Sequence, residues 1–310
     1  MSSRVDEPPQ PSSPPGLPER ITLRDLRRWR RDDVVFPCLT AYDATMARWL
    51  ARAGVPVMLV GDSAAEVVLG LPSTTHAPLE FLLQITAAVR RGAPNAFVVG
   101  DMPFMSYHLD EHEAVANAAR FMVEGNADAV KLEADARFAS VFERLSRAGV
   151  PAIAHVGCLP QQVHLHGGYK VAGRTAESAR RVVEDARTLV AAGAVAVLAE
   201  ATTAETAAKV VEAVDVPVIG CGAGPACHGQ IVVTQDILGL SDWQPSFAGK
   251  EGRIGPSIQV VVEQWCEKVR RRELDHEYEM LDGEANLLEL RPGFVFIRTV
   301  LVLITINLST

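Results

Sequence analysis

Acidic residues and one histidine recur at a single place in this sequence, directly after short apolar runs. Five successive runs end in this way, at Asp62, Asp101, Glu133, His155 and Glu200. One acid at such a position is often the N-cap of the next helix, but four acids in five successive runs predict a shared site. Carboxylates that face one cavity repel each other unless a cation or a shared proton compensates them. All-oxygen ligation suits Mg²⁺, which leaves coordination positions for water and substrate.

Such a site favours proton removal next to a carbonyl group. A 2-oxo acid could bind the metal through its carboxylate and keto oxygens, and the metal would then stabilise the enolate. A carboxylate outside the metal's ligands would be the base. Lys131 lies two residues before Glu133, so both point to one face of a strand. Lys131 would hold a substrate carboxylate or form a structural ion pair, and His155 would donate to a bound oxygen or lie in the core.

The alternation of short apolar runs and helical stretches along the chain predicts the strands and helices that position these residues. Short apolar runs cover residues 34–43, 55–63, 96–101, 127–133, 150–155, 194–200 and 216–224, and an eighth strand is expected at 231–236. Several runs are apolar throughout, which is typical of parallel strands covered on both faces. Helical stretches at 44–53, 80–91, 111–125, 136–148, 174–192, 203–214 and 257–272 supply the crossovers.

This alternation predicts a (β/α)8 TIM barrel, with a doubly wound open sheet as the alternative. In a barrel the carboxyl ends of all strands meet at one rim, where active sites form. We expect a Pro-rich, disordered tail at 1–20, a barrel domain at 21–275 and a C-terminal extension of unknown role at 276–310. The apolar run 293–308 contains Arg298 and is short for a membrane helix, so we favour a packing or subunit-interface segment, with a membrane anchor as the alternative.

The amino-acid composition limits the kinds of partner that the protein is expected to bind. The 310 residues carry a formal charge of −8 and are 48% hydrophobic. This balance argues against binding to nucleic acid or to an anionic membrane surface, which needs clustered Lys and Arg. The five cysteines contain no CxxC pair, and we predict a reducing cytoplasm and no cysteine chemistry. The expected partner is a small molecule.

Two glycine-rich segments could lie near the predicted rim. The segment 220–229 (GCGAGPACHG) offers backbone N–H groups that could cradle an anion, or it is a bare turn. The segment 166–174 (HGGYKVAGR) mixes glycines with Tyr169, Lys170 and Arg174, and we interpret it as a mobile loop over the active site.

At these residues the chain resembles the ketopantoate hydroxymethyltransferases. The resemblance covers about residues 21–250. Its motifs are TAYD (40–43), MLVGDS (58–63), AVRRGAPNAFVVGDMPFMSY (88–107), AVKLE (129–133), AHVGCLPQQVHLHGGYKVAGR (154–174) and VPVIGCGAGPACHGQIVVTQDILGL (216–240). It implies a barrel of the phosphoenolpyruvate mutase and isocitrate lyase superfamily and a homo-oligomer, often a decamer.

The resemblance also implies roles for individual residues. It places the metal, Mg²⁺ or another divalent ion, at Asp62 and Asp101 with Glu133 beside it. Those two aspartates also contact substrate through the metal, the oxo acid itself lies against Ser63, Lys131 and His155, and the general base is Glu200. The implied reaction is enolisation of 3-methyl-2-oxobutanoate and attack of its carbon on 5,10-methylenetetrahydrofolate, which gives 2-dehydropantoate for pantothenate synthesis.

The chain also departs from the family pattern. The loop AAEVVLGLPSTTHA (64–77) lacks the usual His and Asp and gains Glu66, Ala134 and Asp135 replace a Gly pair, and the base-bearing strand reads LAEATTAET. Three readings therefore stay open. They are the hydroxymethyltransferase itself, a relative that acts on another 2-oxo acid as a hydroxymethyltransferase or carbon–carbon lyase, and a non-catalytic barrel that scaffolds an assembly.

Overall fold

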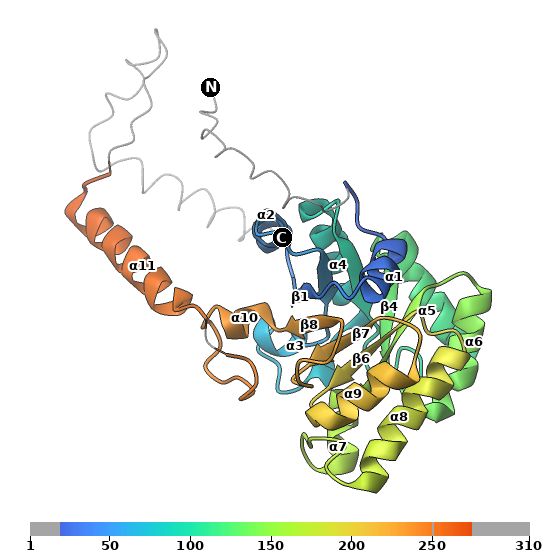
Figure 1. The fold of residues 1–310 in the computed structure, drawn as a ribbon. Coiled ribbons are helices and arrows are strands. Elements are labelled where there is room, and N and C mark those ends of the chain that lie inside the picture. Colours follow the sequence, from blue (N-terminus) through green and yellow to red (C-terminus); the bar gives the residue numbers. More distant parts are fainter. Residues whose placement is uncertain (1–18, 250, 275–310) are drawn as a thin grey trace, which may run out of the picture. The chain divides into compact units, whose positions relative to one another are not determined.

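Eight parallel strands close into a barrel in the computed structural model, which describes residues 19–249 and 251–274. Each strand pairs with the next in chain order, and β8 pairs with β1 to close the ring (Figure 1). The strands are β1 (Phe36–Thr40), β2 (Val57–Val60), β3 (Phe97–Asp101), β4 (Ala129–Glu133), β5 (Ala152–Gly157), β6 (Ala196–Glu200), β7 (Val218–Cys221) and β8 (Gly229–Val232). The predicted (β/α)8 barrel is confirmed, and the open doubly wound sheet is excluded.

Helices precede, connect and follow the strands along the chain. They are α1 (Leu23–Arg31), α2 (Ala44–Arg52), α3 (Ala64–Val67), α4 (Leu79–Gly92), α5 (Glu111–Val123), α6 (Ala139–Arg147), α7 (Val163–His166), α8 (Ala176–Ala191), α9 (Ala204–Ala213), α10 (Thr234–Ile237) and α11 (Ile254–Arg271), with 3-10 turns η1 (Thr74–His76), η2 (Ala136–Phe138) and η3 (Pro160–Gln162). Local capping fixes where several of them begin. The Asp43 carboxylate accepts from two backbone N–H groups of α2, and Asp110 accepts from one in α5.

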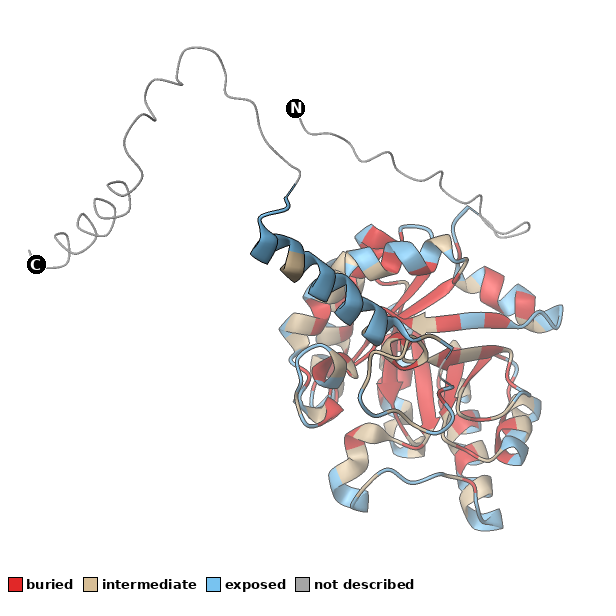
Figure 2. Cartoon of the chain, turned by 90° about the vertical axis from the view of Figure 1, so that its left-hand side faces the viewer, coloured by how far each residue is buried: buried red, intermediate tan, exposed pale blue. Residues whose placement is uncertain are grey.

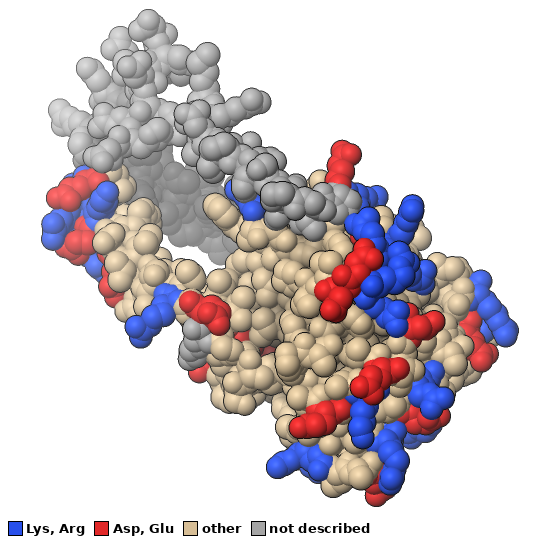
Figure 3. Space-filling view, viewed as in Figure 1, with Lys and Arg blue, Asp and Glu red and all other residues tan. Residues whose placement is uncertain are grey.

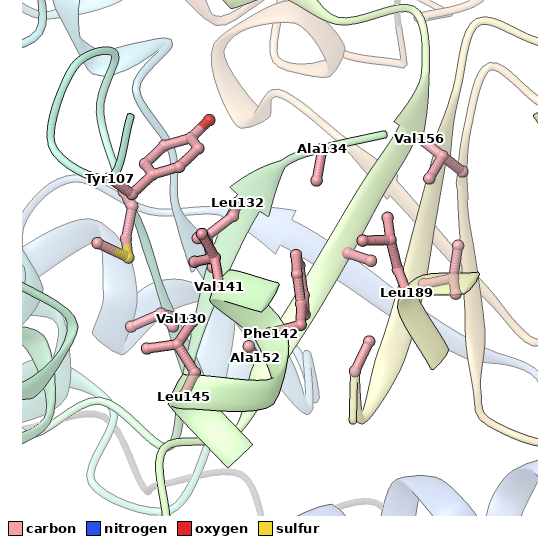
Figure 4. Packing of buried hydrophobic residues seen from close by; sticks show 14 of the residues in the cluster. Tyr107, Val130, Leu132, Ala134, Val141, Phe142, Leu145, Ala152, Val156 and Leu189 are labelled. Atoms are coloured by element: carbon pink, nitrogen blue, oxygen red, sulfur yellow. The ribbon is translucent and has the colours of Figure 1, made fainter. Parts of the chain in front are cut away.

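The alternation of side chains along β4 explains how a polar site forms on a buried strand. Val130 and Leu132 point outward and pack against α6, where Phe142 and Leu145 complete the cluster (Figure 4). Ala129 points inward, into the apolar layer inside the barrel, and with a period of two Lys131 and Glu133 must point inward as well. All five residues of β4 are buried, as are most strand residues (Figure 2).

Two features of the fold differ from the sequence predictions. The helix α1 was not predicted, and its Leu26 and Trp29 join the apolar layer inside the barrel together with Phe36 of β1. The eighth strand was predicted at 231–236, but β8 spans Gly229–Val232 and the next residues form α10. The prediction was wrong because the apolar run continues past the strand, where the Thr234 hydroxyl and N–H bond to Thr40 and begin the helix.

The chain divides into two compact units between Gly255 and Pro256, whereas the predicted barrel domain extends to 275. In the second unit, α11 has no buried residue. Most of the predicted tails, at 1–18 and 275–310, lies outside the described residues, as does the apolar run 293–308. In the described ranges, no helix is both long and apolar enough to cross a membrane.

Candidate active site

The polar residues at the strand ends lie together inside one end of the barrel. Asp101, Glu133 and Glu200 are the last residues of β3, β4 and β6, Asp62 follows β2 by two residues, and His155 lies within β5. The strand register places Asp101 opposite Lys131 and Glu133 opposite His155. Adjacent strands are only about 4.8 Å apart, so these side chains must interact. The structure therefore brings together the residues that the sequence pattern singled out.

An ion pair lies at the centre of the site. Nζ of Lys131 is 2.9 Å from Oδ1 of Asp101, and both side chains are almost fully buried. The backbone N–H of Asp62 donates to the other oxygen of Asp101 at 3.0 Å. Burial lowers the pKa of Lys131, but the carboxylates of Asp101, Asp62 and Glu133 outweigh this and raise it. The ammonium is therefore held in its charged form. Burial raises the pKa of Asp101 to about 8 and that of Glu133 well above its usual value, although Lys131 opposes both shifts, so protons are retained in this cluster near neutral pH.

The imidazole of His155 links this centre to Glu200. Its Nδ1 lies 3.1 Å from Nζ of Lys131 and 3.9 Å from Oε1 of Glu133, and its Nε2 lies 3.5 Å from Oε2 of Glu200. Burial and the charge on Lys131 hold the pKa of His155 well below its usual value, so the ring is neutral. Because Lys131 can only donate, we assign Nδ1 as the acceptor and the proton to Nε2.

Glu200 titrates near neutral pH. Its side chain is about a quarter exposed. Burial raises its pKa to about 7, the charge on Lys131 opposes this, Asp62 adds to it, and a hydrogen bond from Cys221 lowers it. The adjacent backbone is tightly packed, since a Cβ on Gly157 of β5 would lie 2.4 Å from the Glu200 carbonyl oxygen. A rigidly placed carboxylate with this pKa is well suited to accept a proton.

Gln161 is a site residue that the sequence analysis missed. It is buried in η3, and its backbone N–H donates to Oε2 of Glu133 at 2.9 Å. Its Nε2 donates to Oδ2 of Asp62 at 2.9 Å, and the Tyr107 hydroxyl donates to its Oε1 at 2.7 Å. Gln161 thus holds two of the predicted metal-site carboxylates at once. The sequence pattern could not find it because Gln161 lies in a turn and not at a strand end.

Ser63 and Tyr169 lie at the edge of the same site. The Ser63 hydroxyl is 2.8 Å from the hydroxyl of the buried Tyr42, and Ser63 lines the cavity described below. Tyr169 belongs to the predicted loop 166–174, is half exposed and lines this cavity too. The structure therefore places the loop at the site, while its predicted mobility stays a prediction.

A cavity of about 710 Å³ opens above these side chains. Its lining includes Asp62, Ser63, Asp101, Lys131 and Glu200, together with Glu66, Asp236, Ser241, Trp243 and Phe247. This volume is typical of a small-molecule site. On the face shown in Figure 3, basic and acidic side chains are intermixed.

The glycine-rich segment 220–229 serves close packing. A Cβ on Gly224 would lie 2.6 Å from Cβ of Ala204, and one on Gly220 would lie 2.9 Å from Sγ of Cys227. A Cβ on Gly222 would lie 2.5 Å from the ring of Phe247. These contacts favour the reading of a tight turn over that of an anion cradle.

The donor set of the inner site fits a hard divalent cation in part. Asp62 and Asp101 contribute carboxylate oxygens next to each other, and two carboxylates are what Mg²⁺ usually takes from a protein. Oε1 of Glu133 is buried and has no hydrogen-bond partner among the described residues. The described part of the chain holds no group of three or more His, Cys, Asp or Glu side chains placed to bind a metal. Glu133 as a third ligand therefore stays a prediction.

Comparisons with known proteins agree on one family. A family model described as ketopantoate hydroxymethyltransferase matches residues 20–276. A 3-methyl-2-oxobutanoate hydroxymethyltransferase from Ignicoccus hospitalis is 42% identical over 84% of this chain and 98% of its own. Proteins of the same name from Pyrobaculum islandicum (45%, covering 81% of this chain and 95% of its own) and Anaeromyxobacter sp. (43%, covering 82% and 85%) match similarly.

Solved structures share the fold at low sequence identity. A 2,3-dimethylmalate lyase of the phosphoenolpyruvate mutase/isocitrate lyase superfamily has a TM-score of 0.53 at 17% identity, covering 84% of this chain and 93% of its own. A phosphonopyruvate hydrolase has a TM-score of 0.57 at 13% identity, covering 93% and 97%. At these identities the likeness concerns the barrel alone.

Proposed function

The chain belongs to the ketopantoate hydroxymethyltransferase family, and from this premise we propose that it transfers a hydroxymethyl group from 5,10-methylenetetrahydrofolate to 3-methyl-2-oxobutanoate. The product is 2-dehydropantoate, a precursor of pantothenate. One observation carries the proposal. Glu200, a carboxylate whose pKa is raised to about 7, lines the same cavity as Lys131, Asp62 and Asp101.

We assign each residue of the site a role from its position and charge. Lys131 carries the positive charge that a substrate carboxylate needs, and Ser63 offers a hydroxyl at the edge of the inner cavity. His155, with its proton on Nε2, can donate to a developing oxyanion. Glu200 accepts the proton from the carbon next to the keto group, and that carbon then forms a C–C bond to the one-carbon unit of the folate. The bonds of this unit to the folate nitrogens N5 and N10 break, one water molecule supplies the hydroxyl group, and the proton taken by Glu200 ends on the tetrahydrofolate that leaves.

We propose that Asp62 and Asp101 hold Mg²⁺ or another divalent ion, with Glu133 beside it. When bound, such an ion polarises the keto oxygen and offsets the negative charge of the three carboxylates. The support is the donor set itself: oxygen ligands only, two adjacent carboxylates, and a buried oxygen of Glu133 without a hydrogen-bond partner in the described ranges.

Deuterium exchange tests the proposal without the folate. We expect the proton on C3 of 3-methyl-2-oxobutanoate to exchange with D₂O when Mg²⁺ and the wild-type protein are present, as followed by NMR. Glu200→Gln and Asp62→Asn should each abolish this exchange. If the wild type leaves the proton in place, the proposed enolisation is wrong.

A different 2-oxo acid is the second candidate substrate, and Glu66 is the observation that favours it. Glu66 belongs to the divergent loop 64–77 and lines the cavity. Burial, Asp62 and Asp236 raise its pKa, so the loop brings an extra carboxyl group to the substrate. Exchange measured on a panel of 2-oxo acids separates the two candidates, because the true substrate will give the highest kcat/KM.

We also propose that the protein is a homo-oligomer. The helix α11 contains no buried residue, and its exposed apolar residues follow helical spacing: Ile254, Ile258, Val261, Val262, Trp265 and Val269. This spacing makes one continuous apolar stripe. A stripe of this kind needs a partner surface, and a second copy of the chain supplies one.

A further inference from the structure

Part of the cavity lining has no task in enolisation. Of the groups assigned to the oxo acid and to the metal, Asp62, Ser63, Asp101 and Lys131 line the cavity, whereas the buried Glu133 and His155 do not. The whole cavity measures about 710 Å³, a volume that holds a drug-sized ligand and far exceeds a five-carbon acid. A second ligand can therefore share the cavity with the acid.

Asp236 is a buried carboxylate in this part of the lining. It lies in α10 directly after β8, is 5% exposed and lines the cavity. The Ser241 hydroxyl donates to its Oδ1 at 2.7 Å. Within the described residues its Oδ2 has no hydrogen-bond partner and is not among the fully buried oxygens, so it can be reached from the cavity. A ligand that enters the cavity with N–H donors would satisfy it.

Two aromatic side chains line the same cavity as Asp236. Trp243 is 72% exposed and Phe247 is 42% exposed, and both line the cavity. The Phe247 ring rests on Gly222, where no Cβ could be accommodated. Gly222 also has a φ of +62°, which side-chain-bearing residues rarely adopt. The backbone thus seats a partly exposed ring in the wall of the cavity that the Asp236 carboxylate also lines, a combination that suits a flat ligand with donors on one edge.

We propose that Asp236, Trp243 and Phe247 form the subsite for the pterin ring of the one-carbon donor. A pterin is flat and aromatic in its pyrimidine half, and its N3–H and 2-amino groups donate side by side on one edge. A carboxylate can accept both, because Oδ1 has a second lone pair beside the one that Ser241 uses. The two aromatic side chains can stack on its faces. This subsite rests on the proposed use of a folate.

Asp236→Asn is the variant that isolates the proposed contact. The asparagine side chain has the same shape, and its Oδ1 can still accept from Ser241. Its amide group replaces the Oδ2 acceptor with a donor, which opposes the pterin edge. Asp242→Asn is the matched control, because Asp242 is an exposed acid of the same segment that also lines the cavity.

Calorimetric titration with tetrahydrofolate, with Mg²⁺ and 3-methyl-2-oxobutanoate present, tests the subsite independently of turnover. We expect Asp236→Asn to bind about tenfold to a hundredfold more weakly, the usual cost of losing a hydrogen bond to a charged group. Trp243→Ala should also weaken binding, and Asp242→Asn should bind as the wild type does. Unchanged affinity in Asp236→Asn overturns the proposal, as does an equal loss in Asp242→Asn.

Glu66→Gln and deuterium exchange separate the remaining outcomes. If Glu66→Gln loses tetrahydrofolate affinity and Asp236→Asn does not, the pterin lies against the divergent loop and the proposal is wrong. Exchange of the oxo acid measured in the same samples reports on the inner site. Loss of exchange in the wild type with normal tetrahydrofolate binding contradicts the proposed function and leaves the subsite standing.

Discussion

The Nε2 atom of His155 lies 3.5 Å from Oε2 of Glu200. A neutral imidazole that carries its proton on Nε2 presents this proton to the carboxylate when no substrate is bound. An incoming keto oxygen would compete with Glu200 for the same donor. Because these two atoms are only 3.5 Å apart, the protonation state of Glu200 affects the hydrogen bonding of His155, the proposed oxyanion donor.

The first prediction is the pH dependence of proton exchange. Glu200 must be ionised to act as a base, and burial raises its pKa to about 7. Below that pH the carboxyl group is protonated, so log kcat/KM for exchange should fall by about one unit per pH unit, and above it should reach a plateau. A profile that stays flat from pH 5 to 8 would exclude Glu200 as the base.

The second prediction concerns Gln161 and Tyr107. Gln161→Ala removes the amide that holds Asp62, and it should weaken Mg²⁺ or Mn²⁺ binding about tenfold to a hundredfold, as expected for a group that orients a metal ligand. Tyr107→Phe removes only the hydroxyl that donates to Gln161, so we expect a smaller loss. Calorimetric titration of the metal measures both. Equal affinity in all three proteins would show that Gln161 only packs.

The third prediction tests the buried ion pair. Lys131→Met leaves Asp101 buried without its cation, which should lower the free energy of unfolding by about 3–5 kcal/mol. Adding Asp101→Asn removes the unpaired charge and should recover much of this loss. Urea unfolding in the presence of EDTA measures the coupling between the two residues. Additive effects would mean that the 2.9 Å contact contributes no coupling energy.

Much of the site could be predicted because strands impose simple rules on sequence. A period of two requires Lys131 and Glu133 to share a face, and parallel strands require successive carboxyl ends to share a rim. The positions of Asp101, Glu133 and Glu200 follow from these rules alone. The boundaries of the crossover helices were also predicted within three residues, because each has an apolar stripe and α2 and α5 have acidic N-caps.

The remaining features depend on tertiary contacts that leave no local pattern. Gln161 reaches Asp62 only because η3 turns back over the barrel, across 99 residues of chain. The helix α1 reads LRDLRRWRR, and its charge hides the two apolar residues that enter the barrel. Asp236 was hidden for a similar reason, since the apolar run that contains it was predicted to be a strand and forms α10 instead.

The fourth prediction concerns the apolar stripe of α11. Val261→Asp places a charge in the middle of the stripe and should reduce the oligomer to smaller species, because a buried unpaired charge costs several kcal/mol at an interface. Light scattering after size-exclusion chromatography measures the mass. Gln259→Asp, on an exposed position of the same helix outside the stripe, is the control and should leave the mass unchanged. Equal masses for all three proteins would remove α11 from the interface.

The fifth prediction concerns Gly222, whose backbone supports the Phe247 ring of the proposed pterin subsite. Gly222→Ala adds a methyl group 2.5 Å from the Phe247 ring at a φ of +62°, so the ring must move and the KM for methylenetetrahydrofolate should rise. The backbone cost alone is about 1–2 kcal/mol of stability. Gly149→Ala is the control. Gly149 has a φ of +77°, so the backbone cost is the same, but the added methyl group would have no other atom within 4 Å. Both variants should unfold at lower urea concentration, and only Gly222→Ala should raise this KM, because only there does the added atom displace a ring that lines the cavity.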